Sequence, residues 1–564
     1  MSQAPATQVR GDFRKIIWLL LLRLTRMAWV MPRFCVEFLL AALAGFVGRR
    51  SEGEVRDAQA RALTALLEQV GGAFIKFGQI LAMRPDFLPR EYISALSKLL
   101  DDIEPFPTTV AKETLESELG KGVGEIFSEF QEKPLASASF GQVYKARLKS
   151  GEWVAVKVRR PEIHDVVKVD LGILKLVAKF LDFSATLPQE RLFLLYEEFA
   201  RWTTEELDYR VEARNAETLR SASEQNSIEV IPKVYWNLTT QRILTLEYLD
   251  GISLKSILEG REDVRQRCVE DGISLEEVAK NLLRVLLREA FEYGRFHADP
   301  HAGNIFVLPQ NRIGLVDFGI VGFLGTSLRR HLLVLLKEIG RGNADAAFWA
   351  SVRILDPPEY VDLLRYRHDY HANLERWMDV ASDPRASLEE RSSARLILDS
   401  MEISRRHGIG VQTAVVLYYR ALVMVDIIAL QIAPTLDVSA EAYEFLKELR
   451  RQSDVSEVTP DEAVLEYRDF FLELPRRLNE LLTLQIEMRA RDYRRTGRRR
   501  LARLIGGLAN LTVIGALLAF AVGIAGGRVL VAVGVESMPW TLLAGYGLAL
   551  AFVLKRLARS VGRR

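Results

Sequence analysis

Two short segments decide the fold: FHADPHAGN at residues 296–304 and LVDFG at residues 315–319. The second is typical of an apolar strand that ends at Asp317, and the first places Asp299 and Asn304 five residues apart in a loop. Oxygen atoms are the ligands that magnesium prefers, and a carboxylate can also orient an attacking hydroxyl or water. We therefore expect Asn304 and Asp317 to hold Mg2+ and Asp299 to be the catalytic carboxylate. A metal site formed by the two histidines and the aspartate of the first segment is the alternative.

A lysine and a loop of small residues precede these segments. The sequence VAVK at residues 154–157 predicts a strand that ends in Lys157, whose ammonium group can contact nucleotide phosphates. Residues 136–143, ASASFGQV, have the spacing of a phosphate-binding G-x-G-x-x-G-x-V loop with alanine at the first two glycine positions. Small side chains let backbone N–H groups approach phosphate, although alanine lacks the freedom of glycine at positive φ. Taken singly, the two segments could be a surface lysine and a plain turn.

The order of the four segments is that of protein kinases, which makes chance agreement improbable. The sequence therefore predicts an α+β, two-lobed protein-kinase-like fold. A β-rich unit begins at Leu135, and it includes a hairpin over 142–146 and 153–158 and a strand over 242–248. Most of 275–482 is predicted helical apart from two short loops. We place the smaller lobe at 131–250 and the larger lobe at 251–460.

A helical extension is predicted before the smaller lobe, over residues 51–130. Apolar residues from Leu63 to Leu81 recur at three- and four-residue spacing and mark one buried helix face. Lys76 and Gln79 fall on the opposite face. The acidic run at 197–217 is also predicted helical.

The C-terminal region predicts a transmembrane helical hairpin over residues 504–556. Two uncharged runs, at 504–526 and 540–554, are bounded by basic clusters on their outer sides. This charge distribution places both ends, and the kinase-like domain, on the cytoplasmic face of a bacterial inner membrane or its equivalent. A basic helical linker is predicted at 461–503. The N-terminal segment at 1–50 is basic and amphipathic, which favours a helix in the membrane interface or an ordinary core helix about equally.

Composition narrows the function classes. Hydrophobic residues make up 49% and charged residues 27%, and the formal net charge is +2, so no nucleic-acid partner is indicated. The two cysteines, Cys35 and Cys268, are too few for a disulfide framework or a cysteine metal site, which favours a reducing compartment.

The sequence resembles the UbiB/ADCK family of kinase-like proteins, which support ubiquinone biosynthesis. The resemblance rests on KFGQ at 76–79 (the family's K-x-G-Q), the alanine loop, ELD at 206–208 (its E-x-D), and the HADPHAGN and VDFG motifs. Ala302 stands where the family usually has proline, which should loosen the loop slightly without removing a catalytic group. The resemblance implies that the K-x-G-Q helix covers the cleft where a protein kinase receives its peptide, which makes protein phosphorylation unlikely.

The resemblance also implies which charged residues pair with each other and which residues bind ATP. It implies that Glu212 pairs with Lys157 and that Glu206 meets Lys76. If 197–217 is one helix, Glu206 and Glu212 lie about 120° apart on it, so both cannot face one lysine. The residues implied to cover the cleft are Lys76, Gln79, Glu206 and Asp208. The residues assigned to ATP are Ala136, Ser137, Ala138, Ser139, Phe140, Gly141, Val143, Lys157, Glu212, Glu247 and Leu249.

The function expected from residues and resemblance together is that of a Mg2+-dependent ATPase or small-molecule kinase at the membrane. Its partners would be membrane lipid, quinone precursors and quinone-biosynthesis enzymes, and glycine-rich helices in the hairpin could pack with a second copy to form a homodimer. The phosphoryl acceptor, which could be water, lipid or protein, is left open. The alternatives are a nucleotide-binding pseudokinase scaffold that recruits biosynthetic enzymes, and a true protein kinase.

Overall fold

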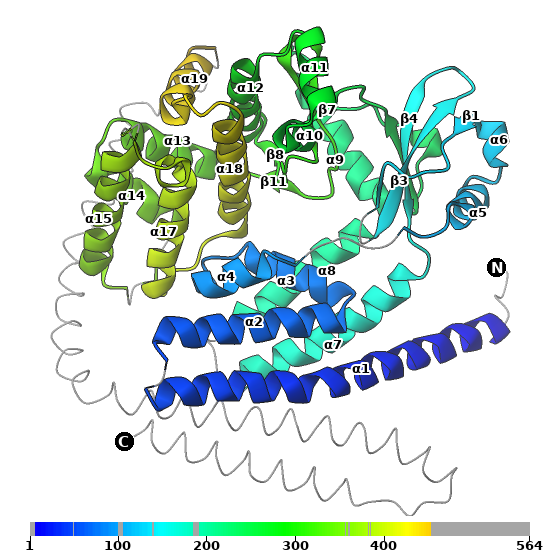
Figure 1. Cartoon of the computed structure of the whole chain (residues 1–564), viewed down its shortest axis with the longest axis horizontal. Coiled ribbons are helices and arrows are strands. Elements are labelled where there is room, and N and C mark those ends of the chain that lie inside the picture. The colour runs from blue at the N-terminus through cyan, green and yellow to red at the C-terminus, as the bar shows by residue number, and fades with distance from the viewer. Residues whose placement is uncertain are drawn as a thin grey trace, which may run out of the picture.

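The computed structural model describes residues 6–48, 50–99, 105–137, 140–183, 191–355, 357–358, 361–381, 383 and 385–452. The linker predicted at 461–503 and the hairpin predicted at 504–556 lie outside the described residues. The described chain is a mixed helix and strand fold that is mostly helical, as the sequence predicts (Figure 1).

A twisted antiparallel sheet forms the smaller lobe, with strand order β1-β3-β4-β6 and β2 paired to β3. Valines on alternate positions of β4, such as Val154 and Val156, face a core closed by Ala111 and Leu115 of α5. The predicted hairpin and the strand over 242–248 are confirmed, but the sheet begins earlier than Leu135, because Phe127 of β1 is already buried in this core. The elements are α5 (Thr108–Leu119), α6 (Val123–Ile126), β1 (Phe127–Phe130), β2 (Ala136–Ser137), β3 (Gly141–Leu148), β4 (Trp153–Arg159) and β6 (Ile243–Glu247).

Gly141, the first residue of β3, has no room for a side chain. A Cβ atom there would lie 2.6 Å from the carbonyl oxygen of Val158 and would also overlap the Tyr209 hydroxyl. We expect Gly141→Ala to lower the free energy of unfolding by about 1–3 kcal/mol, because strand backbone must move to admit the methyl group. Chemical denaturation measures this change. Gly124→Ala in α6 is the matched control, since no atom lies within 4 Å of its added Cβ; an equal loss in both variants would contradict the packing role of Gly141.

Six helices form a layer below the sheet and the larger lobe in the view of Figure 1. They are α1 (Ala6–Phe46), α2 (Glu52–Val70), α3 (Ala73–Ala82), α4 (Arg90–Leu96), α7 (Ile163–Phe183) and α8 (Arg191–Glu206). The continuous helix face predicted from Leu63 to Leu81 is wrong in one respect, because the chain breaks between α2 and α3. Gly71 and Gly72 have φ values of 70° and 63°, which end one helix and redirect the next. Lys76 is therefore carried by a separate short helix.

A buried ion pair holds this layer together. Arg23 of α1 donates to both carboxylate oxygens of Asp170 in α7, at 2.6 and 2.7 Å. The same guanidinium donates to the carbonyl oxygens of Val70 and Gly71, and Asp170 accepts the backbone N–H of Ala73. One pair of charges thus joins α1 and α7 to the break between α2 and α3.

The larger lobe is helical, but it also holds short strands that the sequence analysis did not predict within 275–482. These strands, only three or four residues long, carry the two chemistry-bearing segments (Figure 1). They are β8 (Arg295–His297), β9 (Ile305–Leu308), β10 (Arg312–Leu315) and β11 (Val321–Phe323). Two strands of two residues each, β5 (Glu229–Val230) and β7 (Ile252–Ser253), precede this range and complete the sheet of β9 and β10. Its helices include α9 (Tyr209–Ala222), α10 (Leu254–Glu259), α11 (Glu262–Glu270), α12 (Leu275–Arg288), α13 (Thr326–Gly340), α14 (Ala344–Leu355), α15 (Leu363–Ala381), α16 (Leu388–Arg391), α17 (Ser393–Arg406), α18 (Thr413–Ile432) and α19 (Val438–Gln452).

Two described helices are long and apolar enough to cross a membrane: residues 15–46 of α1, and α18. Helix α18 contributes many side chains to the core of the larger lobe. Its charged residues are paired inside the protein, since Asp426 accepts hydrogen bonds from Ser392 and Ser393. These contacts make α18 a core helix of this lobe.

Candidate functional site

Lys157 and Glu212 form an ion pair between the sheet and α9. The Lys157 ammonium donates to both oxygens of the Glu212 carboxylate, at 3.0 and 2.9 Å, which is the pairing that the resemblance implies. Burial raises the pKa of Glu212 to about 7. At Lys157 burial acts in the opposite direction, but the charges of Asp317 and Glu212 outweigh it and raise the pKa well above its usual value. Because two hydrogen bonds join the groups, we take the pair as charged.

Asp317 follows β10 and faces the same ammonium. Its Oδ2 atom lies 3.5 Å from Lys157 Nζ, and its Oδ1 atom accepts the backbone N–H of Gly319 at 3.3 Å. Burial opposes ionisation, but the charge of Lys157 lowers the pKa of Asp317 to about 2, so the carboxylate is ionised at neutral pH. The residue has a φ of 63°, in the left-handed region that few non-glycine residues occupy. Such backbone strain is concentrated at functional sites.

The loop after β8 holds Asp299 and Asn304. His297 holds this loop in place through both ring nitrogens. Its Nδ1 atom accepts the N–H of Asp299 at 3.1 Å, and its Nε2 atom lies 3.0 Å from the carbonyl oxygen of Val316. Burial lowers the pKa of His297, which keeps the ring neutral. Asn304 closes the loop by donating from Nδ2 to the carbonyl oxygen of Asp299 at 3.2 Å. Both ring nitrogens of His297 are engaged in hydrogen bonds, so neither is available to a metal ion. The alternative of a histidine-ligated metal site is therefore left with only one of its two histidines.

The remaining donors fit magnesium bound together with nucleotide phosphates. The described residues contain no group of three or more His, Cys, Asp or Glu side chains that could hold a metal alone. Asn304 and Asp317 offer amide and carboxylate oxygens, and Mg2+ is usually bound by one or two such ligands plus substrate phosphates. These two residues would hold the ion, which would neutralise phosphate charge there.

The alanine loop lies over the Lys157 side of the site. Ala136 and Ser137 form β2, which pairs with Gln142 and Val143 of β3. Ala138 and Ser139 lie outside the described residues. Phe140 is buried, and the Lys76 ammonium lies 4.7 Å from the centre of its ring. The loop is therefore in contact with the helical extension.

The extension reaches the site through Lys76, which forms an ion pair with Glu206 as the resemblance implies. The helix predicted over 197–217 is wrong: α8 ends at Glu206, and α9 begins at Tyr209. Asp208 is the N-cap of α9, accepting the N–H of Arg210, and it also pairs with the Arg210 side chain. The angular comparison of Glu206 with Glu212 therefore does not apply, although the pairing that the resemblance implies is present.

Two of the residues expected to cover the cleft point elsewhere. Asp208 caps a helix, and Gln79 donates to the carbonyl oxygen of Leu99, 3.3 Å away, inside the extension. Lys76 and Glu206 are the members of that set that meet. Glu247 ends β6 and Leu249 follows it, in the connection that leads from the sheet to the larger lobe, with Leu249 buried and Glu247 exposed.

Arg420 is a site residue that the sequence analysis missed. It stands in α18 and donates to Asp299 Oδ1 at 2.7 Å, which leaves the second carboxylate oxygen of Asp299 to accept from another group. The sequence separation of 121 residues hides this contact. The sequence feature that could have pointed to this residue is that it is the single arginine in the mainly apolar sequence of residues 413–432.

Two buried carboxyl groups, Glu229 and Glu289, lie close to the loop that holds the site, and Glu289 contacts His297 directly. Glu289 accepts the N–H of His297 at 3.1 Å, and Asn226 donates to Glu229 at 2.9 Å. Burial raises the pKa of Glu229 to about 7, and burial together with the charge of Glu229 raises that of Glu289. The pair therefore keeps at least one proton at pH values where free glutamate has lost it.

This pair should make folding stability fall as pH rises. Between about pH 4.5 and 7 the unfolded chain has lost the Glu229 proton while the folded chain retains it, so the free energy of unfolding decreases with pH. We expect Glu229→Gln to flatten the slope by up to about 1.4 kcal/mol per pH unit. Denaturant unfolding across this range measures it, with exposed Glu224→Gln as the control. An unchanged slope in Glu229→Gln would contradict the assignment.

Comparisons with known proteins identify similar chains. The profile of the ABC1 atypical kinase-like domain matches residues 98–349. The uncharacterized protein slr0889 of Synechocystis is 33% identical over 378 residues, which are 66% of this chain and 90% of that protein. The Arabidopsis protein Activity of BC1 Complex Kinase 1, chloroplastic, is 39% identical over 51% of this chain and 41% of its own length. The chain thus spans about two fifths of that chloroplast relative.

Among solved structures, the Rv3197–erythromycin complex from Mycobacterium tuberculosis is similar to this chain. It has a TM-score of 0.48 and 23% sequence identity, and the match covers 67% of this chain and 93% of that one.

Proposed function

Because the chain belongs to the ABC1 (UbiB) family of atypical kinase-like proteins, we propose that it is a Mg2+-dependent ATPase or small-molecule kinase that supports isoprenoid-quinone biosynthesis at a membrane. The observation that carries the catalytic part is the cluster of Lys157, Glu212 and Asp317 at one end of the sheet, with both Lys157 contacts within 3.5 Å. These are the groups that position nucleotide phosphates in kinases.

Each residue has a definite task in this proposal. Glu212 holds Lys157, whose ammonium contacts the phosphates, and Asn304 with Asp317 holds the metal. Asp299 orients the acceptor hydroxyl or water with the carboxylate oxygen that Arg420 leaves free. Glu247 and Leu249 line the nucleotide base, and the loop at 136–143 covers the phosphates. Bound magnesium would supply charge neutralisation for the leaving phosphate.

The contacts of Lys76 favour a small acceptor over a protein substrate. Its ammonium is paired with Glu206 and packs on Phe140 of the loop, so α3 lies beside the phosphate-binding loop. A peptide would have to displace these contacts to approach Asp299. We therefore favour an enzyme that transfers phosphate to water or a small lipid. A pseudokinase scaffold ranks second, because the presence of all catalytic positions argues against it, and a protein kinase ranks third.

The membrane part of the proposal is supported by α1. Its outer face exposes Trp18, Trp29, Leu40 and Phe46, with exposed fractions of 62%, 86%, 60% and 73%. Arg23 on the opposite face is buried and ion-paired, so α1 is attached to the layer near its middle. We propose that α1 lies in the membrane interface, on the cytoplasmic side. Quinone precursors, biosynthetic enzymes and a homodimer through the hairpin are the proposed partners.

The test follows the labelled γ-phosphate. The full-length protein in lipid nanodiscs is incubated with γ-labelled ATP and a membrane extract. The proposal predicts label in inorganic phosphate or in the lipid fraction, and none in protein above a heat-inactivated sample. Label mainly in protein would support the protein kinase instead. If Asp299→Asn neither changes turnover nor impairs complementation of a quinone-deficient strain, the scaffold is favoured.

A further inference from the structure

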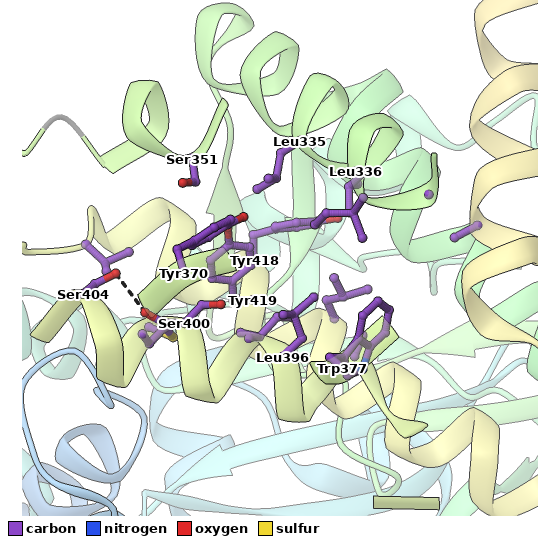
Figure 2. A pocket seen from close by; sticks show the side chains of 18 of the residues that line it. Leu335, Leu336, Ser351, Tyr370, Trp377, Leu396, Ser400, Ser404, Tyr418 and Tyr419 are labelled. Atoms are coloured by element: carbon purple, nitrogen blue, oxygen red, sulfur yellow. Dashed lines mark hydrogen bonds between the residues drawn. The ribbon is translucent and has the colours of Figure 1, made fainter. Parts of the chain in front are cut away.

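The helices of the larger lobe enclose an apolar cavity of about 130 Å³ that contains none of the residues assigned to nucleotide or magnesium (Figure 2). Its walls come from α12, α13, α14, α15, α17, α18 and α19. Figure 2 shows Tyr370 and Tyr418 between Leu335 and Leu336 on one side and Leu396 on the other. The cavity thus lies inside the core of the larger lobe.

The size and lining of the cavity limit what it can hold. Protein cores leave few voids larger than a water molecule, and an empty void is destabilising. An apolar cavity of about 150 Å³ stays dry and binds benzene. A cavity of 130 Å³ lined mainly by leucine, isoleucine and aromatic rings is therefore suited to one six-membered ring.

The polar groups on the wall limit the ligand further. The Tyr366 hydroxyl is hydrogen-bonded to Ser404 at 3.2 Å, and Ser400 accepts from Asn373 at 3.1 Å. The Tyr419 hydroxyl has no hydrogen-bond partner among the described residues, and its ring is only partly buried. Burial raises the pKa of Tyr419, so the hydroxyl keeps its proton and can donate it. A donor that lines the cavity and has no acceptor among the described residues can pair with a ligand oxygen.

The neighbouring residue, Tyr418, differs from Tyr419 in how deeply it is buried. Tyr418 is fully buried, and its ring packs edge-on against Phe291 and Phe296, with ring centres 5.6 and 5.9 Å apart. Its hydroxyl is buried and also has no partner among the described residues. Because Tyr418 lines the same cavity, Tyr418→Phe tests whether its hydroxyl is the donor in place of that of Tyr419.

From these observations we infer that the cavity is a second ligand site, which binds a six-membered apolar ring carrying one carbonyl oxygen, with Tyr419 as the hydrogen-bond donor. The site is distinct from the nucleotide site but shares a helix with it. Tyr419 lines the cavity, and Arg420, the next residue of α18, donates to Asp299. The inference does not depend on the acceptor proposed for the phosphoryl group.

Two probes of equal heavy-atom count test the site: cyclohexanone, which has a carbonyl oxygen, and methylcyclohexane, which has none. Dissociation constants are measured by ligand-observed NMR on the full-length protein in nanodiscs, with free concentrations matched through the vapour phase and empty nanodiscs subtracted. We expect the wild-type protein to bind both rings and to prefer cyclohexanone. Tyr419→Phe should weaken cyclohexanone binding by about 2- to 10-fold, the range for one neutral hydrogen bond, and leave methylcyclohexane unchanged.

Three further variants complete the design. Tyr418→Phe should leave both affinities unchanged. Leu336→Trp should fill the cavity and abolish binding of both rings, whereas Leu364→Trp, at an exposed position of α15, should abolish neither. Circular dichroism checks folding, and if Leu336→Trp does not fold, the Tyr419→Phe comparison decides alone. No binding above empty nanodiscs, or an unchanged preference for cyclohexanone in Tyr419→Phe, would overturn the inference.

Discussion

Asp317→Asn is expected to lower the ATP turnover of the purified protein by on the order of a hundred- to a thousandfold. The substitution keeps the shape of the side chain but removes the negative charge that faces Lys157 at 3.5 Å and that is proposed to hold magnesium. Folding should be preserved, because asparagine is among the residues best able to adopt the φ of 63° found here. Phosphate release in nanodiscs, under saturating ATP and Mg2+, measures the change.

The matched control is Asp250→Asn. That carboxylate is on the surface, where it pairs with Arg267 at 3.3 Å, and it is not among the residues assigned to nucleotide or metal. We expect its turnover to remain within twofold of the wild type. If Asp317→Asn also stayed within twofold, the assignment of Asp317 as a metal ligand, and with it the proposed ATPase, would be wrong.

Arg23→Met is expected to lower the free energy of unfolding by about 3–5 kcal/mol. Methionine fills similar space but leaves the Asp170 carboxylate buried without its counter-charge, and it removes the donors to Val70 and Gly71. The break between α2 and α3 then loses its anchor, so the position of Lys76 should change too. Denaturant unfolding in detergent gives the stability, and the accessibility of Lys76 to amine labelling reports its position.

Two variants make this test specific. Arg33→Met removes an exposed ion pair with Glu37 on the same helix and should cost less than about 1 kcal/mol. The double variant Arg23→Met with Asp170→Asn should be less destabilised than the sum of the single changes, because the buried charge disappears while an acceptor for the Ala73 N–H remains. Equal losses for Arg23→Met and Arg33→Met would show that burial of the pair has no special role.

The sequence by itself was sufficient for those parts of the site whose residues are close together along the chain or lie on a regular strand. Asp299 and Asn304 share one loop, Asp317 follows the short strand β10, and Lys157 lies within β4, two residues before the predicted strand in fact ends. Their spacing follows from local backbone geometry, which the residue pattern reports directly. The hairpin of β3 and β4 was predictable for the same reason, since valines alternate on β4 and a glycine turn joins the strands.

Only the tertiary structure decided the contacts that join distant segments. The two glycines at 71–72 end α2 before Lys76, and α8 ends at Glu206, although the apolar and acidic patterns run through both breaks. The pairs Arg23–Asp170 and Arg420–Asp299, separated by 147 and 121 residues, were not predicted. The pair Lys76–Glu206, separated by 130 residues, was implied by the family resemblance and not by residue spacing. Each charge is tolerated in the interior because folding brings its partner to it. Residue spacing cannot report such a contact, since the packing of whole helices determines which buried charges meet.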